Sequence, residues 1–286
     1  MGRALFASAI LALLLTTTAP GTALAEACAG RDGWSERAPP AAIFGNVHHV
    51  GTCGITVLLV TGADGHILID GATAEAAPGI LDNIRTLGFR PRDVRLILSS
   101  HEHVDHVGGF AALKRATGAH VVSRAPARAV LETGEAEPDD PQAGTIPGFP
   151  GVKVNAVVAD GETLRVGRLA VTAHATPGHT AGGTSWSFEA CAPACRRVVY
   201  ADSLTAVGPD SYRFSDHPAL VATFRATFDK VAGLPCDILL TPHPGASNLF
   251  ARIAGTAPLV DPNACAAYAA GARRRLDERL AREEAR

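Results

Sequence analysis

Five histidines and one aspartate in this sequence have the residue types and the spacing of a metal site. Three of the histidines and the aspartate fall within six consecutive positions, and the other two histidines follow downstream: His101, His103, Asp105, His106, His179 and His243. Zinc binds imidazole nitrogen and carboxylate oxygen at about 2.0–2.2 Å, and a catalytic zinc typically has three protein ligands and one position open for water. Six ligands are therefore enough for two zinc ions.

The first four ligands are predicted to lie on a loop that follows a buried strand. The apolar, β-branched segment 94–98 indicates the strand, and the segment 110–117 behind the motif indicates a helix. If the loop is locally extended, side-chain alternation places His101 and His103 on the same side, where both can reach one ion. The next two ligands of the motif would then turn toward a second ion.

A pair of metal ions has a specific chemical use. Two ions about 3.5–4 Å apart bind a shared water and lower its pKa toward about 7, which gives a metal-bound hydroxide near neutral pH. The alternative is a structural zinc site, but such sites favour closed, cysteine-rich sets of four ligands. No cysteine lies near the 101–106 motif. The pattern therefore indicates a catalytic site that needs no serine or cysteine nucleophile.

The motif resembles the His-x-His-x-Asp-His signature of the metallo-β-lactamase fold hydrolases. The resemblance extends to the segments 176–180 and 240–245 and covers most of the chain from about Ile43 to the C-terminus. Within the family, the chain is similar to the third subclass (subclass B3) of the metallo-β-lactamases, in which Asp, His and His bind the second metal and no cysteine does. The resemblance implies an α/β fold, specifically a four-layered αββα sandwich.

The resemblance also implies roles for individual residues. The first zinc would be held by His101, His103 and His179. The second zinc would be held by Asp105, His106 and His243. Asp105 would also be catalytic, because it would position the nucleophile and relay a proton. Ser203 and Thr205 would lie near the carboxylate of the substrate.

Three acidic residues outside the ligand set are also informative. Asp202 tests the subclass, because an aspartate in this region bridges the two metals in thioesterases and lactonases of this fold. Asp202 and Ser203 are adjacent, so in extended backbone only one can face the site, and we expect Ser203 to do so. Asp70 matches a buried aspartate that the family places beneath the metal loops, where hydrogen bonds orient the ligands. Glu102 is expected to point away from the metals and has no predicted catalytic role.

The N-terminus and the composition predict an exported enzyme. Residues 1–25 contain a basic Arg3, an apolar run at 4–15 that is too short to span a bilayer, and a small-x-small cleavage site ending at Ala25. We therefore expect a signal peptide at 1–25, a single periplasmic domain at 26–286, and a monomer. The formal net charge of −2 gives no indication of a nucleic-acid or membrane-binding surface.

Six cysteines in an exported chain allow 15 disulfide pairings, and the sequence alone does not choose among them. An oxidising compartment favours bridges over free thiols. In the fold that the resemblance implies, proximity favours the pairs Cys28–Cys53, Cys191–Cys195 and Cys236–Cys265.

Local patterns predict further elements. Strands are expected at 55–60, 66–70 and 121–122, with a second strand set at 152–158, 163–166 and 169–174. Helices are expected at 80–87, 125–132, 218–231 and 264 to the C-terminus. The segment 135–150 is rich in Pro, Gly and acidic residues and has no periodicity, which predicts a surface loop. This loop either borders the active-site groove or is an inert excursion.

The function that the resemblance implies is zinc-dependent hydrolysis of the amide bond of β-lactam antibiotics, which would confer resistance. The substrate would be a small molecule with a carboxylate. One alternative is another hydrolase of this fold, a lactonase or a thioesterase, and predicted export and Ser203 argue against it. A second alternative is a zinc-binding protein without catalytic activity.

Overall fold

The computed structural model describes residues 20–285, and two β-sheets form its centre. The first sheet has the strand order β1 to β7 along the chain. Neighbouring strands are antiparallel from β1 to β4 and parallel from β4 to β7. The strands are β1 (Ala41–Phe44), β2 (Val47–His49), β3 (Leu58–Val60), β4 (His66–Ile69), β5 (Val94–Leu98), β6 (His120–Ser123) and β7 (Ala156–Val157).

The second sheet has the order β12-β11-β10-β9-β8. Strands β8 to β11 are antiparallel neighbours, and β12 pairs with β11 in parallel. The strands are β8 (Thr163–Val166), β9 (Leu169–Ala175), β10 (Thr184–Cys191), β11 (Cys195–Tyr200) and β12 (Ile238–Leu240).

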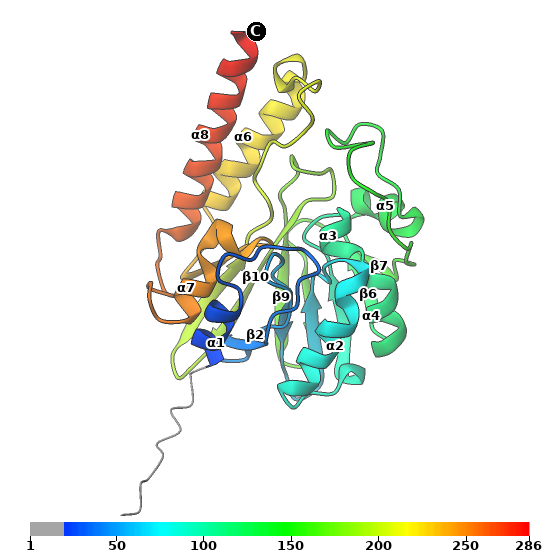
Figure 1. Cartoon of the computed structure of the whole chain (residues 1–286), viewed down its shortest axis with the longest axis vertical. Helices are drawn as coiled ribbons and strands as arrows, with labels where there is room; N and C mark the ends of the chain where they lie inside the picture. Colours follow the sequence, from blue (N-terminus) through cyan, green and yellow to red (C-terminus); the bar gives the residue numbers. More distant parts are fainter. Residues whose placement is uncertain (1–19, 286) are drawn as a thin grey trace, which may run out of the picture.

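Helices cover the outer face of each sheet, with α2, α4 and α5 on one side of the molecule and α6 and α8 on the other (Figure 1). The α-helices are α1 (Pro20–Ala27), α2 (Ala77–Thr86), α3 (Val104–Val107), α4 (Phe110–Thr117), α5 (Arg128–Thr133), α6 (Pro218–Ala232), α7 (Leu249–Ile253) and α8 (Ala264–Glu284). Short 3₁₀ turns are η1 (Ala74–Ala76), η2 (Pro91–Asp93), η3 (Ala125–Ala127), η4 (Phe214–Asp216) and η5 (Pro244–Ser247). The predicted four-layered αββα sandwich is confirmed.

Three apolar clusters lie between these four layers. The central cluster packs the facing sides of the two sheets and includes Leu98 of the first sheet and Trp186 of the second. A second cluster packs α2 and α4 against the first sheet and includes Phe110. A third packs α6 and α8 against the second sheet through side chains such as Phe228 and Leu276. Burial of apolar area on both faces of each sheet holds the layers together.

The structure differs from the sequence-based expectation for the segment 152–158. Only Ala156–Val157 forms a strand, β7, and it belongs to the first sheet and not to the second strand set. Val152 and Val154 are buried in the cluster on the helix side of the first sheet. The amide of Val152 donates to the carbonyl of Leu131 in α5. The apolar pattern therefore reflects packing against a helix, and it does not reflect a longer strand.

Most of the predicted signal peptide lies outside the described residues. Its last residues, 20–25, belong to α1, in which Leu24 is fully buried in a cluster with Cys28 and Cys53. The leader and the boundary after Ala25 stay predictions. Between residues 20 and 285, no helix has both the length and the apolar character that a membrane crossing requires.

The three predicted disulfides are confirmed, and they connect Cys28 with Cys53, Cys191 with Cys195, and Cys236 with Cys265. The Cys191–Cys195 bridge closes the turn between β10 and β11. The Cys236–Cys265 bridge joins the chain just before β12 to the first turn of α8.

We predict that the buried Cys236–Cys265 bridge contributes more to stability than the Cys191–Cys195 bridge. The residues it connects are 29 apart, against 4 for the other pair. By loop-closure entropy, Cys236→Ala with Cys265→Ala lowers the free energy of unfolding by about 3–4 kcal/mol, and Cys191→Ala with Cys195→Ala by about 2 kcal/mol. Urea unfolding of both double variants measures the difference. Equal losses would contradict the entropic account.

Candidate metal centre

The predicted site residues lie at one edge of the two sheets. Strands β4 and β5 are parallel. In the second sheet, β9, β11 and β12 run in one direction, because β10 is antiparallel to both β9 and β11. The segments that follow the carboxyl ends of these five strands carry Asp70, His101, His179, Asp202 and His243. The topology thus gathers residues that are up to 173 positions apart in sequence, as the difference between 243 and 70 shows.

The His101–His106 motif is extended at first and then helical. The backbone at His103 has φ −81° and ψ 153°, and the one-turn helix α3 begins at the next residue. The extended part carries His101 and His103, and the helix carries Asp105 and His106. The ring centroids of His101 and His106 lie 4.1 Å apart and those of His101 and His103 4.9 Å apart, so His101 lies beside both parts of the motif. The turn of the last two ligands toward a second ion stays a prediction.

Two groups of three buried side chains among the described residues could each hold a metal ion. His101, His103 and His179 offer ligand atoms that all lie within 4.8 Å of one another, and so do His101, Asp105 and His106. The Nε2 atom of His101 is buried and has no hydrogen-bond partner. A buried polar atom without a partner is costly, and a metal ion at this position would remove that cost. The residues therefore fit a metal.

His243 joins the second group. Its Nε2 lies 3.4 Å from Asp105 Oδ2 and 3.4 Å from His106 Nε2. His106 Nε2 in turn lies 3.1 Å from Asp105 Oδ2. These three atoms form a compact triangle. All six side chains that the sequence predicted therefore lie together at one edge of the two sheets. Their function as ligands stays a prediction.

Each of the five imidazoles is held at one ring nitrogen by an oxygen acceptor of the protein, and we call this nitrogen the outer nitrogen. The pairs are His101 Nδ1 with Asp202 Oδ1 at 2.8 Å, His103 Nε2 with Asp140 Oδ2 at 2.9 Å, His106 Nδ1 with Asp70 Oδ2 at 3.3 Å, His179 Nδ1 with the Thr205 carbonyl at 2.7 Å, and His243 Nδ1 with the Gly54 carbonyl at 3.2 Å. Such partners orient metal-binding histidines and fix their tautomer. The other nitrogen of each ring is the one that would bind a metal.

Asp70 is the buried aspartate that the sequence predicted beneath the metal loops. Besides its contact with His106, it accepts hydrogen bonds from the Ser100 amide and the Ser100 hydroxyl, both at 2.7 Å. The hydroxyl of Tyr200, on β11 of the second sheet, lies 2.8 Å from Asp70 Oδ2. The backbone of Asp70 has φ 65°, a strained conformation for a residue with a side chain. This carboxylate thus joins both sheets to the ligand loop.

Glu102 points away from the metal positions, as expected, but it has a role that the sequence did not reveal. Its buried carboxylate accepts hydrogen bonds from the Thr180 hydroxyl and the Gly182 amide, both at 2.8 Å. Burial raises the pKa of this carboxyl. Glu102 therefore connects the loop of His101 to the loop of His179. In the sequence, only the position of Glu102 between two predicted ligands indicated a role, and that position does not identify its hydrogen-bond partners Thr180 and Gly182.

Asp202 and Ser203 occupy different surroundings. Asp202 is fully buried and contacts the outer nitrogen of His101. Its second oxygen packs against Gly183, where an added Cβ would lie only 2.7 Å from that oxygen. Ser203 is also buried, with 6% exposure. The Thr205 hydroxyl lies 3.3 Å from His179 Nδ1. The predicted contacts of Ser203 and Thr205 with substrate stay predictions.

The protonation of the imidazoles suits a metal site. Burial, together with neighbouring imidazoles, holds the pKa of His101 well below its usual value and lowers the pKa of His179 to about 3. Both rings are therefore neutral and able to bind a metal. Burial opposes a charge on His106 as well, but Asp105 and Asp70 outweigh it and raise the pKa of His106 to about 10. Without a metal, His106 carries a proton between two carboxylates, and a cation can replace this proton.

A cavity of about 700 Å³ borders Asp140, the partner of His103. Its wall includes Glu102, Asp140, Tyr212 and His217. The rings of Tyr212 and His217 stack, with centroids 4.5 Å apart and planes inclined by 7°. The volume is in the range of small-molecule binding sites.

Comparison with known proteins identifies similar chains. The model of the metallo-beta-lactamase superfamily matches residues 50–243. The crystal structure of the metallo-beta-lactamase MIM-1 from Novosphingobium pentaromativorans is 54% identical, with a TM-score of 0.90, over 92% of this chain and 98% of that chain. MEM-A1, a subclass B3 metallo-beta-lactamase from a soil metagenome library, is 42% identical, with a TM-score of 0.84, over 88% of this chain and 99% of that chain.

Curated sequences give shorter matches. A hydroxyacylglutathione hydrolase of Methylobacterium nodulans is 35% identical over 113 residues, which are 40% of this chain. The chain thus matches only about a third of the length of that relative, 35%.

We predict that Asp70 contributes to both metal binding and stability. Asp70→Ala removes the acceptor shared by His106, Ser100 and Tyr200, so metal affinity falls about 10- to 100-fold. Unsatisfied buried donors cost about 1–3 kcal/mol each, and the free energy of unfolding falls accordingly. Chelator competition and urea unfolding measure the two effects. As a control, Asp82→Ala removes a carboxylate in exposed ion pairs, which changes stability by at most about 1 kcal/mol; equal behaviour of the two variants would contradict the role of Asp70.

Proposed function

Because the chain belongs to the metallo-beta-lactamase superfamily, we propose that it is a subclass B3 enzyme that uses two zinc ions to hydrolyse the amide bond of β-lactam antibiotics, and thereby confers resistance. The observation that carries the proposal is the convergence of five imidazoles and one carboxylate, with the outer nitrogen of every ring anchored. The likeness to metallo-beta-lactamases over about nine-tenths of the chain supports it.

The ligands divide into two sets of three. The first zinc is held by His101, His103 and His179, and the second by Asp105, His106 and His243. When bound, the two ions supply a water of lowered pKa as the nucleophile and a Lewis acid for the lactam carbonyl. Histidine and carboxylate ligands without cysteine are typical of a catalytic zinc site with an open position.

Asp105 is the catalytic residue of the chain itself. Burial opposes ionisation, but the neighbouring imidazoles of His106 and His243 hold the pKa of Asp105 below its usual range. As a carboxylate, Asp105 accepts a hydrogen bond from the attacking water and orients it toward the carbonyl. The same oxygen accepts the proton of that water and delivers it to the lactam nitrogen when the carbon–nitrogen bond breaks.

Other residues bind and position the substrate. The hydroxyls of Ser203 and Thr205 donate hydrogen bonds to the carboxylate that a β-lactam carries. The cavity that borders Asp140 accepts a side chain of the substrate, and the stacked rings of Tyr212 and His217 offer it an apolar wall. Glu102 keeps the two ligand loops together during turnover.

The protein acts as a monomer in the periplasm after removal of residues 1–25. The three disulfides support an oxidising compartment, since such bridges form and persist there.

The alternative activities are those of relatives with shorter matches. A hydroxyacylglutathione hydrolase and an N-acyl homoserine lactonase match 40% and 23% of this chain. Purified protein that cleaves glutathione thioesters or acyl-homoserine lactones, but no β-lactam, would favour these activities. Stoichiometric zinc without hydrolysis of any of the three substrates would favour a binding protein.

We predict that metal removal abolishes turnover reversibly. Dialysis against a chelator removes the group that activates water, so hydrolysis of nitrocefin and a carbapenem stops, and added zinc restores it. Absorbance assays measure turnover, and metal analysis measures occupancy in the same samples. Unchanged folding of the dialysed protein, checked by circular dichroism, is the control. Hydrolysis that continues in metal-free protein would rule out the proposed function.

We predict that His243→Ala leaves one zinc per chain in place of two. The change removes one vertex of the triangle with Asp105 and His106 and leaves the three-histidine group intact. Turnover of nitrocefin falls by at least about 100-fold, because loss of a catalytic electrostatic group costs about 10²–10³ in rate. His120→Ala, at an exposed position on β6, is the matched control and retains both ions and full activity. Two ions bound to His243→Ala would contradict the ligand assignment.

A further inference from the structure

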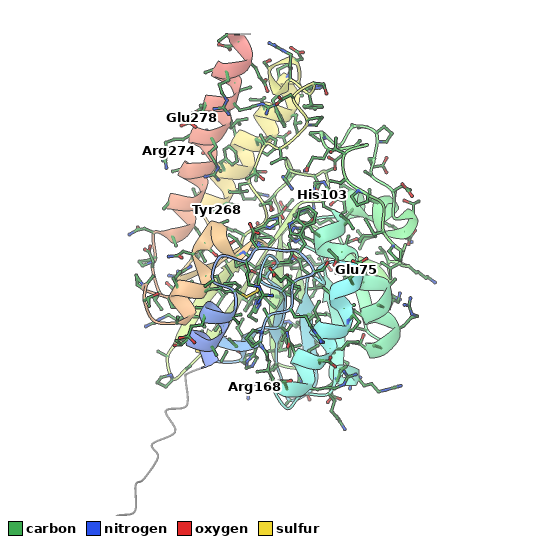
Figure 2. The ribbon with its side chains drawn as sticks, viewed as in Figure 1. Glu75, His103, Arg168, Tyr268, Arg274 and Glu278 are labelled. Carbon is green, nitrogen blue, oxygen red and sulfur yellow. A yellow bond between two sulfur atoms is a disulfide. The ribbon has the colours of Figure 1, made fainter. Side chains whose placement is uncertain are left out.

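A loop of residues 135–150 reaches the metal centre. In Figure 1 this loop, drawn in green, extends from α5 toward the end of the molecule where Figure 2 labels His103. Its base is closed by two backbone hydrogen bonds, from the Phe149 amide to the Gly134 carbonyl at 3.0 Å and from the Val152 amide to the Leu131 carbonyl at 2.7 Å. Such compact loops with closed bases are frequently functional. Of the two alternatives for this segment, the structure favours a loop that borders the site over an inert excursion.

The tip of the loop has a defined conformation around Asp140. The Asp140 amide donates to the Glu137 carbonyl at 3.0 Å, and the Ala143 amide donates to the Asp140 carbonyl at 2.9 Å. Oδ1 of Asp140 accepts a hydrogen bond from the Gln142 amide at 2.7 Å, the pattern of an Asx turn. One carboxylate oxygen is thus used inside the loop, which leaves the other free to act outside it.

That second oxygen contacts a predicted metal ligand. Asp140 Oδ2 lies 2.9 Å from His103 Nε2, and both side chains are at least nine-tenths buried, with exposures of 9% and 5%. A carboxylate accepts only, so His103 must carry its hydrogen on Nε2. This tautomer leaves the Nδ1 lone pair free for a metal, and the nearby carboxylate increases its basicity. The Gln142 side-chain amide lies 3.5 Å from Nδ1, too far for a strong hydrogen bond.

His103 differs from the other four imidazoles in where its partner comes from. The acceptors of His101, His106 and His179 belong to segments that directly follow β-strands, and the acceptor of His243 lies next to a disulfide-bonded cysteine. Only His103, among these five, is anchored by the long loop. The orientation of this ligand therefore depends on the position of the loop.

We propose that Asp140 is a positioning residue for the metal ligand His103, and that through this contact the 135–150 loop and a metal ion at His101, His103 and His179 stabilise each other. The coupling is reciprocal by thermodynamic linkage. A loop in place favours the metal by orienting His103, and a metal on Nδ1 favours the loop by fixing the ring that Asp140 contacts. The inference rests on the metal site of the proposed function, and it does not depend on the substrate.

The test measures metal affinity at the three-histidine group alone. His243→Ala protein serves as the background, because its remaining zinc reports this group. In that background, Asp140→Ala weakens zinc about 10- to 100-fold by chelator competition, in the range of lost outer partners of metal ligands. Asp140→Asn keeps the size of the side chain and an acceptor oxygen but removes the charge, so it weakens zinc by a smaller factor. Asp139→Ala, at the adjacent exposed position, changes affinity by at most about twofold.

A second readout separates positioning from a general loss of structure. Zinc slows proteolysis within residues 135–150 of the full chain, and Asp140→Ala removes this protection while Asp139→Ala keeps it. Zinc affinities of Asp140→Ala and Asp140→Asn within twofold of the background, or equal zinc protection of the loop in all variants, would overturn the proposal. If Asp140→Ala does not fold, the Asp140→Asn affinity decides.

The two proposals can fail separately. Absence of β-lactam turnover in the unmodified protein, together with weaker zinc in the Asp140 variants, would reject the proposed function and retain this inference. Full β-lactam turnover in the unmodified protein, together with unchanged zinc affinity in the Asp140 variants, would retain the proposed function and reject this inference.

Discussion

The structure depends on one kind of interaction, an acceptor oxygen behind each imidazole of the metal centre. Five rings meet at one edge of the molecule, and imidazoles crowded together have no mutual attraction that would hold them in place. Carboxylates of Asp70, Asp140 and Asp202 and two backbone carbonyls supply that attraction. Each one fixes a ring angle and directs a lone pair inward. The geometry of the site is therefore set by residues that touch no metal.

The packing of the two sheets against each other determines the geometry of the metal centre. Asp70 follows a strand of the first sheet and contacts Tyr200 of the second. Trp186, in the core between the sheets, donates to the carbonyl of Ser99 at 2.9 Å, and the Thr184 amide donates to the carbonyl of Ser100 at 2.7 Å. These bonds attach the start of the ligand loop to the second sheet. A shift of one sheet against the other would move ligands that belong to both.

The fold and the convergence of the six candidate ligands could be predicted from the sequence, because the spacing of the motif is local and carries the family resemblance that implies the fold. Six metal-binding side chains at family spacing are rare, and alternating or continuous apolar runs indicate strands. The roles of Asp140 and Glu102 could not be predicted, since each depends on a contact between segments far apart in the chain: Asp140 with His103, and Glu102 with Thr180. The segment 152–158 was misjudged for a related reason, because valines that pack against a helix give the same pattern as a strand.

The disulfide between Cys28 and Cys53 places a redox-sensitive bond next to the support of one imidazole. Gly54, whose carbonyl holds His243, directly follows Cys53. Gly54 also fits tightly, because a Cβ there would lie 2.0 Å from the carbonyl oxygen of Asp32. Backbone hydrogen bonds to the carbonyls of Glu36 and Gly33 also hold this segment, so reductive cleavage of the bridge would remove one of several constraints on the Gly54 carbonyl. Thiol–disulfide exchange would therefore act next to the support of His243, and not next to the acceptors of the other four rings, none of which is adjacent to a cysteine.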